Sequence, residues 1–443
     1  MNKTSFITAL AAHQNGVNSL TTITNTADLS KPNNEESDSK QDTSHPLHSL
    51  WNHFDHSWIK HLSPETPENR IKSQKTAGAT DDGHSNNVKR PVFNGHYVPV
   101  RPLALKNPRL VIHSPDMATR LGFSPTDVHS PEFTLFFSGD VDRAFHAITG
   151  GTTVDDKIAT WATPYALSIM GTRYTSNCPY GTGDGYGDGR AISIGEVLSP
   201  SDLSHDGLPQ RYELQLKGAG PTPFCRGADG RAVYRSSIRE FLASEAMHHL
   251  NISTTRALSL ILSDGVSGDK VNRPWYSEDS KRQGLPDIQD PRLSQYSLED
   301  RKMILAQLKA QIKNDPNIMI QEPCAITCRV SPSFVRVGHI DLFARRATRD
   351  LIQEDAKPNI NSAEFHELEQ LLWHACYREF PSQCYHPFHK DNDVASASKA
   401  LLENSLENIS TLVANWIRVG FVQGNFNADN CLIAGRTMGM LAS

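Results

Sequence analysis

The chain has 443 residues and a formal net charge of −5, with 38 % hydrophobic and 21 % charged residues. This composition is ordinary for a soluble protein, and the length allows two or three domains. The charge gives no electrostatic reason to expect a nucleic-acid partner or an anionic membrane surface. No apolar run approaches the roughly 18 residues that a transmembrane helix needs. The seven cysteines are odd in number and widely scattered, which predicts reduced thiols rather than a secreted disulfide framework.

The first 49 residues are predicted to be a disordered or targeting tail. Residues 1–27 are rich in Ser, Thr and Asn and contain no acid, which is weakly typical of an organellar transit peptide. Residues 28–48 contain almost no apolar side chain, so they cannot bury enough surface to offset the entropy of ordering. A plain disordered tail is therefore the preferred interpretation, with targeting as the alternative.

Apolar side chains at helical spacing then mark a short N-terminal segment at 50–63, which contains two tryptophans and a phenylalanine. Residues 64–91 are polar again and predict a linker, and order is expected to resume at residue 92. A helix is predicted within 154–171. A glycine-rich turn then opens a predicted strand at 187–196.

Two turns have the composition of a phosphate-binding loop. Gly187, Gly189 and Arg190 could bring backbone N–H groups close to a phosphate and supply a counter-charge, although a tight hairpin is the simpler alternative. Asp229 and Gly230 form a turn before a predicted helix, where an Asx turn and a nucleotide contact are equally compatible with the sequence. Neither turn is specific by itself.

A lysine at the end of a strand and an acid on the following helix form a more specific pair. The strand 212–217 alternates between apolar and polar residues, which places Lys217 on its polar face. Glu240 lies 23 residues later on a helix predicted over 236–250, outside the apolar stripe of that helix. Kinase-like folds hold nucleotide phosphates with such a pair, while a solvated surface lysine is the alternative. The predicted stripe consists of Ile238, Leu242, Ala246 and Leu250.

The polar stretch 263–320 is predicted to be an insertion that contributes little to the core, with one helix at 299–313. Further on, apolar residues spaced by three and four predict an amphipathic helix that ends at Gly420. A loop with the sequence Gly-Asn-Phe-Asn-Ala-Asp-Asn follows at 424–430. The predicted buried stripe of the amphipathic helix is Leu402, Leu406, Ile409, Val413 and Trp416.

Four further residues carry side chains suited to phosphate or metal chemistry. Arg329 and Arg336 could each bind a phosphate through two N–H groups, with surface ion pairing as the alternative. Asp429 and Asn430 place a carboxylate beside an amide oxygen, so one could act as a base and the other as a ligand of a hard cation. The His and Cys residues at 374–389 match no closed zinc site in their spacing, so ordinary packing is the preferred interpretation there.

Taken together, these residues resemble the selenoprotein O family of protein adenylyltransferases. The likeness is most specific in the string LQLKGAGPTPFCRGADGRAVYRSSIREFLASEAMHHL at 214–250, in TTRALSL shortly after it, and in RVSPSFVRVGH at 329–339. The strings FDHSW and NPRLV are similar to the family's N-terminal landmarks, and GFVQGNFNADNCLIAG is similar to its catalytic loop. With weaker stretches included, the resemblance covers roughly residues 50–435.

The resemblance implies an α+β protein with a protein-kinase-like fold of two lobes. It places a nucleotide-binding N-lobe region at 92–345 and a partial helical C-lobe, which contains the catalytic loop, at 346–443. It also implies a mitochondrial location, with the cytoplasm as the alternative. Neither a nucleic-acid partner nor a membrane span is expected.

The resemblance further implies transfer of AMP from ATP to Ser, Thr or Tyr hydroxyls of protein substrates, with Mg²⁺ or Mn²⁺ as the cofactor. Asp429 would be the general base and Asn430 a metal ligand. Glu240 would belong to the nucleotide site through its pairing with Lys217. The residues implied to contact the nucleotide are Gly187, Gly189, Arg190, Lys217, Asp229, Gly230, Arg329 and Arg336.

Two positions depart from the family's pattern. Gln423 stands where a histidine often precedes the glycine of the catalytic loop, and it can still form hydrogen bonds. Gly439 stands where an aspartate of an Asp-Tyr-Gly-Pro stretch would bind the metal, and the chain ends four residues later. We therefore expect a C-terminally truncated chain with an incomplete C-lobe. If the printed sequence is complete, an ATP-binding pseudoenzyme or inactive fragment is the alternative, and a kinase-type phosphotransferase is a further one.

Overall fold

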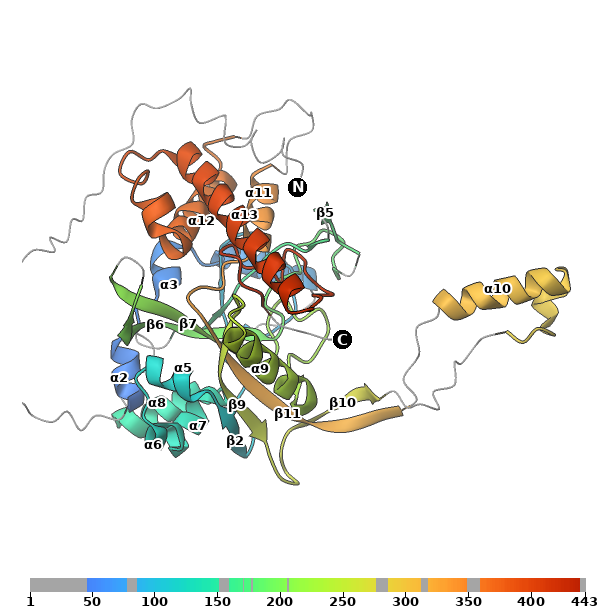
Figure 1. Cartoon of the computed structure of the whole chain (residues 1–443), viewed down its shortest axis with the longest axis horizontal. Helices are drawn as coiled ribbons and strands as arrows, with labels where there is room; N and C mark the ends of the chain where they lie inside the picture. The colour runs from blue at the N-terminus through green and yellow to red at the C-terminus, as the bar shows by residue number, and fades with distance from the viewer. Residues whose placement is uncertain are drawn as a thin grey trace, which may run out of the picture.

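The protein is built around one large antiparallel β-sheet, as the computed structural model shows (Figure 1). The α+β class expected from the sequence is confirmed. The predicted tail as far as residue 45, and Gly439, lie outside the described part of the chain. The structure describes residues 46–77, 86–150, 159–169, 171–176, 178–204, 207–275, 286–311, 318–348 and 359–438.

The sheet contains nine strands and brings distant parts of the sequence together. Its strands are β1 (Val98–Pro99), β2 (Pro108–His113), β3 (Trp161–Ala162), β6 (Ala191–Leu203), β7 (Pro209–Lys217), β8 (Ala232–Val233), β9 (Arg256–Ser263), β10 (Lys270–Trp275) and β11 (Ile318–Ser331). They run in the order β1-β3-β6-β7-β11-β9-β2, while β8 and β10 pair with β11. The register places Lys217 opposite Thr327 and Gln215 opposite Arg329, so β7 and β11 carry two predicted site residues on neighbouring strands.

Four short helices lie together against the sheet, namely α5 (Pro115–Arg120), α6 (Pro125–Val128), α7 (Pro131–Phe137) and α8 (Val141–Thr149) (Figure 1). Three of them begin at a Ser-Pro pair, a helix-start signal that is recognisable in the sequence. The side chains of Ser114, Ser124 and Ser130 each accept a hydrogen bond from a backbone N–H three residues later. Proline follows at the first helical position, where its missing N–H costs nothing.

A second group of helices lies at the other end of the molecule (Figure 1). It consists of α11 (Val337–Ala347), α12 (Ala363–Glu379), the π-helical turn η3 (Pro381–Tyr385) and α13 (Val394–Arg418). Buried side chains form one hydrophobic core between the sheet and α5 to α8, and a separate one among α11, α12 and α13. The long helix α9 (Tyr234–His249) packs on β9 and β11 between these two groups.

The N-terminal part of the described chain is more structured than the sequence predicted. Helix α2 (Pro46–Asn52) begins inside the expected tail, and α3 (Ser57–His61) follows it. The stretch 64–91, expected to be a linker, contains helix α4 (Pro67–Ala77) and a fully buried ion pair between Arg90 and Glu65. This stretch is held in place by a buried ion pair and not by apolar side chains. Its polar composition therefore led to the wrong prediction of a linker.

The described part of the segment predicted as a helix at 154–171 is extended instead. It carries β3 and β4 (Ser168–Ile169), and β4 pairs in a small hairpin with β5 (Thr172–Arg173), which directly follows the segment. In the polar stretch 263–320, strand β10 joins the sheet, whereas the 3-10 turn η2 (Pro291–Leu293) is followed by α10 (Leu298–Gln311), which stands apart from the body (Figure 1). This stretch therefore contributes one strand to the sheet.

The buried faces of α9 and α13 differ from the predicted stripes. On α9, Leu242 is 54 % exposed, and the fully buried residues are Ser237, Glu240, Phe241 and Ser244. Of the predicted stripe, Ile238 packs against the core, as expected. On α13, Leu402 and Leu406 are exposed and Leu401 and Leu412 are buried instead, whereas Trp416 is buried as predicted. Apolar spacing identified both helices, but it did not identify the face that the rest of the chain covers.

A buried ion pair links three segments that lie far apart in the sequence. Arg378 of α12 pairs with Glu196 of β6, and its Nη1 also donates to the Ser57 hydroxyl of α3 at 2.7 Å. The backbone N–H of Trp58 donates to the same carboxylate at 2.7 Å. All the charged atoms are buried, so each partner depends on the other for neutralisation.

We therefore expect Arg378→Leu to destabilise the fold by about 3–5 kcal/mol, because it leaves the carboxylate of Glu196 buried and unpaired. Urea unfolding measures this difference. The control is Lys399→Ala, which removes an exposed i,i+4 pair on α13 and should change the free energy of unfolding by less than about 0.5 kcal/mol. Equal effects of the two variants would contradict the structural role assigned to Arg378.

Candidate active site

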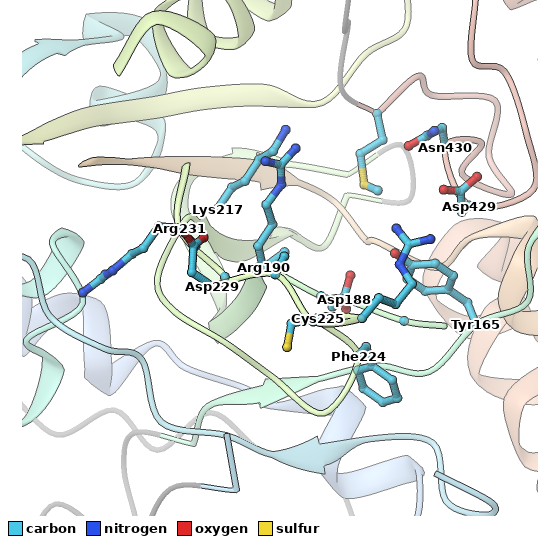
Figure 2. Close-up of a pocket in the computed structure, with 18 of the residues that line it drawn as sticks. Tyr165, Asp188, Arg190, Lys217, Phe224, Cys225, Asp229, Arg231, Asp429 and Asn430 are labelled. Carbon is cyan, nitrogen blue, oxygen red and sulfur yellow. The ribbon is translucent and has the colours of Figure 1, made fainter. Parts of the chain in front are cut away.

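One cavity of about 680 Å³ gathers ten of the eleven residues that the sequence predicted for a site. Its walls come from the glycine-rich turn before β6, the end of β7, the loop 224–231, strand β11, the start of α11 and the loop 425–430 (Figure 2). The eleventh residue, Glu240, lies buried directly behind Lys217. The ten lining residues are Gly187, Gly189, Arg190, Lys217, Asp229, Gly230, Arg329, Arg336, Asp429 and Asn430.

Glu240 neutralises two buried cations at once. Its Oε2 accepts a hydrogen bond from Lys217 Nζ, and its Oε1 accepts one from Arg329 Nε. Burial alone would raise the pKa of Glu240, but the charges of Arg329 and Lys217 outweigh it and lower this pKa. Burial and the neighbouring Arg329 lower the pKa of Lys217, while Glu240 opposes them. The carboxylate is thus what keeps two cations together at the cavity wall.

Two of the predicted glycines are required by the packing of the protein itself. A Cβ at Gly187 would lie 2.5 Å from the Phe224 ring and 2.5 Å from the Thr163 carbonyl oxygen. Gly230 has φ +69°, and a Cβ there would lie 2.1 Å from the backbone of Gly220. Both turns are therefore pressed against neighbouring backbone, which fixes the shape of this cavity wall.

The cavity is rich in cations. Seven basic residues and three aspartates line it. One aspartate, Asp229, accepts two hydrogen bonds from Arg273 of β10, at 2.8 and 2.9 Å, so strand β10 contributes to the site. The excess of positive charge favours a polyanionic ligand. The basic residues are Arg190, Lys217, Arg226, Arg231, Arg273, Arg329 and Arg336.

The opposite end of the cavity joins α11 to the loop that carries Asp429. Arg336 lies 4.2 Å from the centre of the Tyr165 ring and donates from Nη1 to the backbone carbonyl of Asp429 at 3.1 Å. Its other terminal nitrogen, Nη2, pairs with Asp188. Figure 2 shows Asp188, Tyr165 and Asp429 around the same end of the cavity, which agrees with their shared contacts to Arg336.

Two buried oxygens in this loop are not satisfied by the described protein. Asp429 Oδ1 and Asn425 Oδ1 receive no hydrogen bond from the residues that the structure describes. Asn430 is held by its donor end, since Nδ2 bonds the backbone carbonyl of Asn425 at 3.1 Å. Burial raises the pKa of Asp429 above its ordinary value, with Arg336 opposing this effect. The loop therefore offers oxygen acceptors that suit a hard cation or a hydroxyl proton.

Metal binding here would depend on few protein ligands. Within the described ranges, no three His, Cys, Asp or Glu residues come together as a metal site, and this holds for the group at 374–389 as well. All seven cysteines lie in described parts of the chain and are free thiols, as the sequence predicted. An oxygen-preferring cation held by one or two side chains and by a bound polyanion fits this arrangement.

Comparison with known proteins assigns the chain to a family. A family model described as protein adenylyltransferase SelO matches residues 87–274 and 301–440. The chain belongs to the SelO family. It is 34 % identical over 386 residues to the protein nucleotidyltransferase YdiU of Azoarcus sp. (strain BH72), covering 87 % of this chain and 53 % of that protein. The relatives from Aromatoleum aromaticum and Xanthomonas campestris pv. campestris (strain B100) are 35 % and 36 % identical over 350 and 339 residues.

The matches cover only part of each relative, which limits what they show about this chain. They cover 79 % and 76 % of this chain and 50 % and 48 % of the relatives from A. aromaticum and X. campestris, so the chain spans about half the length of the curated relatives it matches. These SelO relatives are bacterial proteins, and they lend no support to the mitochondrial location that the resemblance implied. Within the described part of the chain, no helix has both the length and the apolar character that crossing a bilayer requires.

The prediction from the sequence missed several residues that line or support the cavity. Asp188 lies inside the Gly-Asp-Gly-Arg turn that was singled out, so its position gave a signal that the prediction did not use. Asn425 likewise lies in the predicted loop. Tyr165 and Arg273 had no local signal, because they reach the cavity from segments predicted as a helix and as an insertion.

Strand β7 carries another buried acid, Glu213, which does not line the cavity. Glu213 is 1 % exposed and accepts hydrogen bonds from the Ser193 hydroxyl at 2.7 Å and from the backbone N–H of Phe334 at 3.1 Å. Burial raises the pKa of Glu213 to about 7 despite these bonds. This acid holds the segment that leads to Arg336, and its charge state depends on pH near neutrality.

We expect Glu213→Gln to remove a pH-dependent loss of stability. The folded protein keeps a proton on Glu213 up to about pH 7, whereas the unfolded chain releases it near 4.5, so stability falls as the pH rises through this window. Relative to the variant, the wild type should lose on the order of 3 kcal/mol between pH 4.5 and 7.5. Urea unfolding at stepped pH measures the difference, with the exposed Glu407→Gln as control. Parallel curves for wild type and Glu213→Gln would refute the assignment.

Proposed function

We propose that this protein binds ATP in the cavity of Figure 2 and transfers AMP to Ser, Thr or Tyr hydroxyls of other proteins. Membership of the SelO family supports the reaction class. One structural observation carries the proposal: the buried cluster of Lys217, Glu240 and Arg329 faces the same cavity as Asp429 and Asn430. A polyphosphate bound to the cations would thereby lie next to a carboxylate.

The cations of the cavity are the proposed phosphate ligands. Lys217 and Arg329 are held at the wall by Glu240, so their positions are fixed before a ligand arrives, which lowers the entropic cost of binding. Arginine can meet a phosphate with two parallel N–H groups, and lysine adds a point charge. The proposed nucleotide contacts are Gly187, Gly189, Arg190, Lys217, Asp229, Gly230, Arg329 and Arg336, with Glu240 acting through Lys217 and Arg329.

Asp429 is the proposed general base. The acceptor hydroxyl oxygen forms a bond to the α-phosphorus of ATP and passes its proton to Asp429. The bond between the α-phosphorus and the oxygen bridging to the β-phosphorus breaks, and pyrophosphate leaves with that electron pair. The raised pKa of Asp429 makes it a stronger base than an ordinary carboxylate. The buried cations stabilise the negative charge that develops on the phosphates.

Asn430 is the proposed protein ligand of Mg²⁺ or Mn²⁺. The unsatisfied oxygens of Asp429 and Asn425 support an oxygen-preferring cation at this place. When bound, such a cation neutralises phosphate charge and helps to orient the triphosphate. The residues present therefore fit the ion that the resemblance implied. Position 439, where the family has an aspartate ligand, is a glycine in this chain and lies outside the described residues.

We further propose that the molecule has the two-lobed arrangement of protein kinases. One lobe would comprise the sheet and its hydrophobic core, and the other would comprise α11, α12 and α13 with the second core. The boundary would then fall before α11 and not after residue 345, where the resemblance placed it. Support comes from the separation of the two cores and from the cavity, whose walls come from both groups of elements. In this arrangement the loop with Asp429 faces the sheet across the nucleotide.

Labelled ATP distinguishes the candidate reactions. With casein or the protein itself as acceptor, we expect label from the α-phosphate to become bound to protein in the presence of Mg²⁺, and label from the γ-phosphate not to. Transfer of the γ label would instead establish a phosphotransferase. Thermal stabilisation by ATP with neither label transferred would establish a nucleotide-binding pseudoenzyme.

Asp429→Asn tests the proposed base. It should reduce AMP transfer about 10²- to 10⁴-fold while ATP affinity changes only a few-fold, because the amide keeps the shape but accepts no proton. In the wild type the rate should rise with pH through the raised pKa of Asp429, since only the ionised form accepts the proton. The exposed Asp391→Asn is the matched control. An Asp429→Asn variant that keeps the wild-type rate and pH profile would remove Asp429 from this role.

A further inference from the structure

We propose that Asp188 is a positioning residue, which holds Arg336 so that Arg336 fixes the backbone of the loop carrying Asp429. The proposal rests on the proposed function in one respect, namely the role of Asp429 as the base. It concerns a residue that lies between two glycines of the predicted phosphate-binding turn and itself has no phosphate-binding chemistry, because a carboxylate repels a phosphate.

The carboxylate of Asp188 is fully engaged by the protein. Asp188 is 2 % exposed, and its Oδ2 accepts hydrogen bonds from the backbone N–H of Thr163 at 3.1 Å and from the Thr163 hydroxyl at 2.5 Å. Its Oδ1 accepts from Arg336 Nη2. The Thr163 hydroxyl also contacts His339 Nε2 at 3.0 Å. Asp188 is therefore anchored on one side and directed at Arg336 on the other.

Arg336 in turn is the point where α11 meets the catalytic loop. Its Nη1 donates to the Asp429 carbonyl, so the guanidinium bridges Asp188 and the backbone of the proposed base. The chain directly after it continues this contact, since the N–H groups of Val337 and Gly338 donate to the carbonyls of Cys431 and Ala428 at 2.9 and 2.8 Å. Three hydrogen bonds from the start of α11 thus hold the backbone of residues 428–431.

The charge of Asp188 decides where the guanidinium points. Arg336 is 3 % exposed, and a buried cation must have an anion within reach. While Asp188 supplies that anion, two of the three guanidinium nitrogens are used inside the protein. If the carboxylate becomes an amide, Arg336 loses its paired anion, and the charged groups left to act on it are the side chain of Asp429 and the phosphates of the bound nucleotide. Loss of Asp188 should therefore release the loop and leave phosphate binding intact or stronger.

The test compares Asp188→Asn with Asp202→Asn. Asp202 lies on β6 outside the lining of the cavity and accepts hydrogen bonds from Arg120 at 2.9 Å and from the Tyr212 hydroxyl at 2.7 Å, so its loss removes an ion pair that is more exposed than that of Asp188. Three quantities are measured in the full chain: the Kd for a fluorescent ATP analogue, kcat and KM with α-labelled ATP, and amide hydrogen exchange in residues 425–432. Thr163→Val serves as a second, uncharged perturbation of the same anchor.

For Asp188→Asn we expect kcat to fall about 10- to 100-fold, because a displacement of the base by about 1 Å is sufficient for such a loss. Kd and KM for the nucleotide should stay within about threefold of the wild type or decrease, and exchange in residues 425–432 should accelerate. Thr163→Val should show the same pattern more weakly, and Asp202→Asn should show neither the loss of kcat nor the faster exchange.

Several results would overturn the proposal. A loss of nucleotide affinity matching the loss of kcat would make Asp188 part of phosphate binding, and unchanged exchange in residues 425–432 would remove its link to the loop. If Asp188→Asn does not fold, unchanged exchange and kcat in Thr163→Val would have the same consequence. The exchange measurement does not depend on AMP transfer, so a failure of the proposed reaction in the wild type is recognised separately.

Discussion

The arrangement of the site depends on one buried carboxylate, that of Glu240. Strands β7 and β11 bring Lys217 and Arg329 to the same cavity wall, and two buried cations side by side repel each other and lose their hydration. Glu240 gives one oxygen to each. The antiparallel register and the position of α9 on the sheet are thereby linked to the electrostatics of the cavity, because a slip of either element would separate a cation from this acid.

The same interaction explains why the face of α9 was predicted wrongly. The buried face of α9 contains Phe241 but also Glu240 and two serines. The sheet supplies the cations opposite Glu240, and the sequence of the helix does not contain that information. Leu242 is left half exposed on the outer face as a consequence. The position of helix α13 in the sequence was also predicted correctly, but part of its buried face was predicted wrongly. The face of a helix that becomes buried is decided by distant segments and not by its own apolar spacing alone.

The cavity itself was more predictable than the packing around it. Gly187, Lys217 and Asp429 belong to short motifs whose residue types are restricted by local geometry or by chemistry, and the fold brings these motifs together. Tyr165 and Arg273 reach the cavity through strand pairing and long-range contacts that no local pattern specifies. The sequence thus predicted ten of the residues that line the cavity, while the contacts that hold them there required the tertiary structure.

The hydrogen bonds of the four acids in and behind the cavity wall distinguish Asp429 from the other three. Asp188 is paired with Arg336, Asp229 with Arg273, and Glu240 with two cations, so the charge of each is committed to the protein. Asp429 differs, because its Oδ1 is buried and receives no hydrogen bond from the described residues, and because burial raises its pKa. Arg336 holds the backbone carbonyl of Asp429, while the side-chain Oδ1 of Asp429 has no hydrogen-bond donor among the described residues. This carboxylate can therefore accept a proton without first breaking an ion pair. For this reason Asp429 is the proposed acceptor of the hydroxyl proton. Asp188, Asp229 and Glu240 are instead proposed to hold the cations in place.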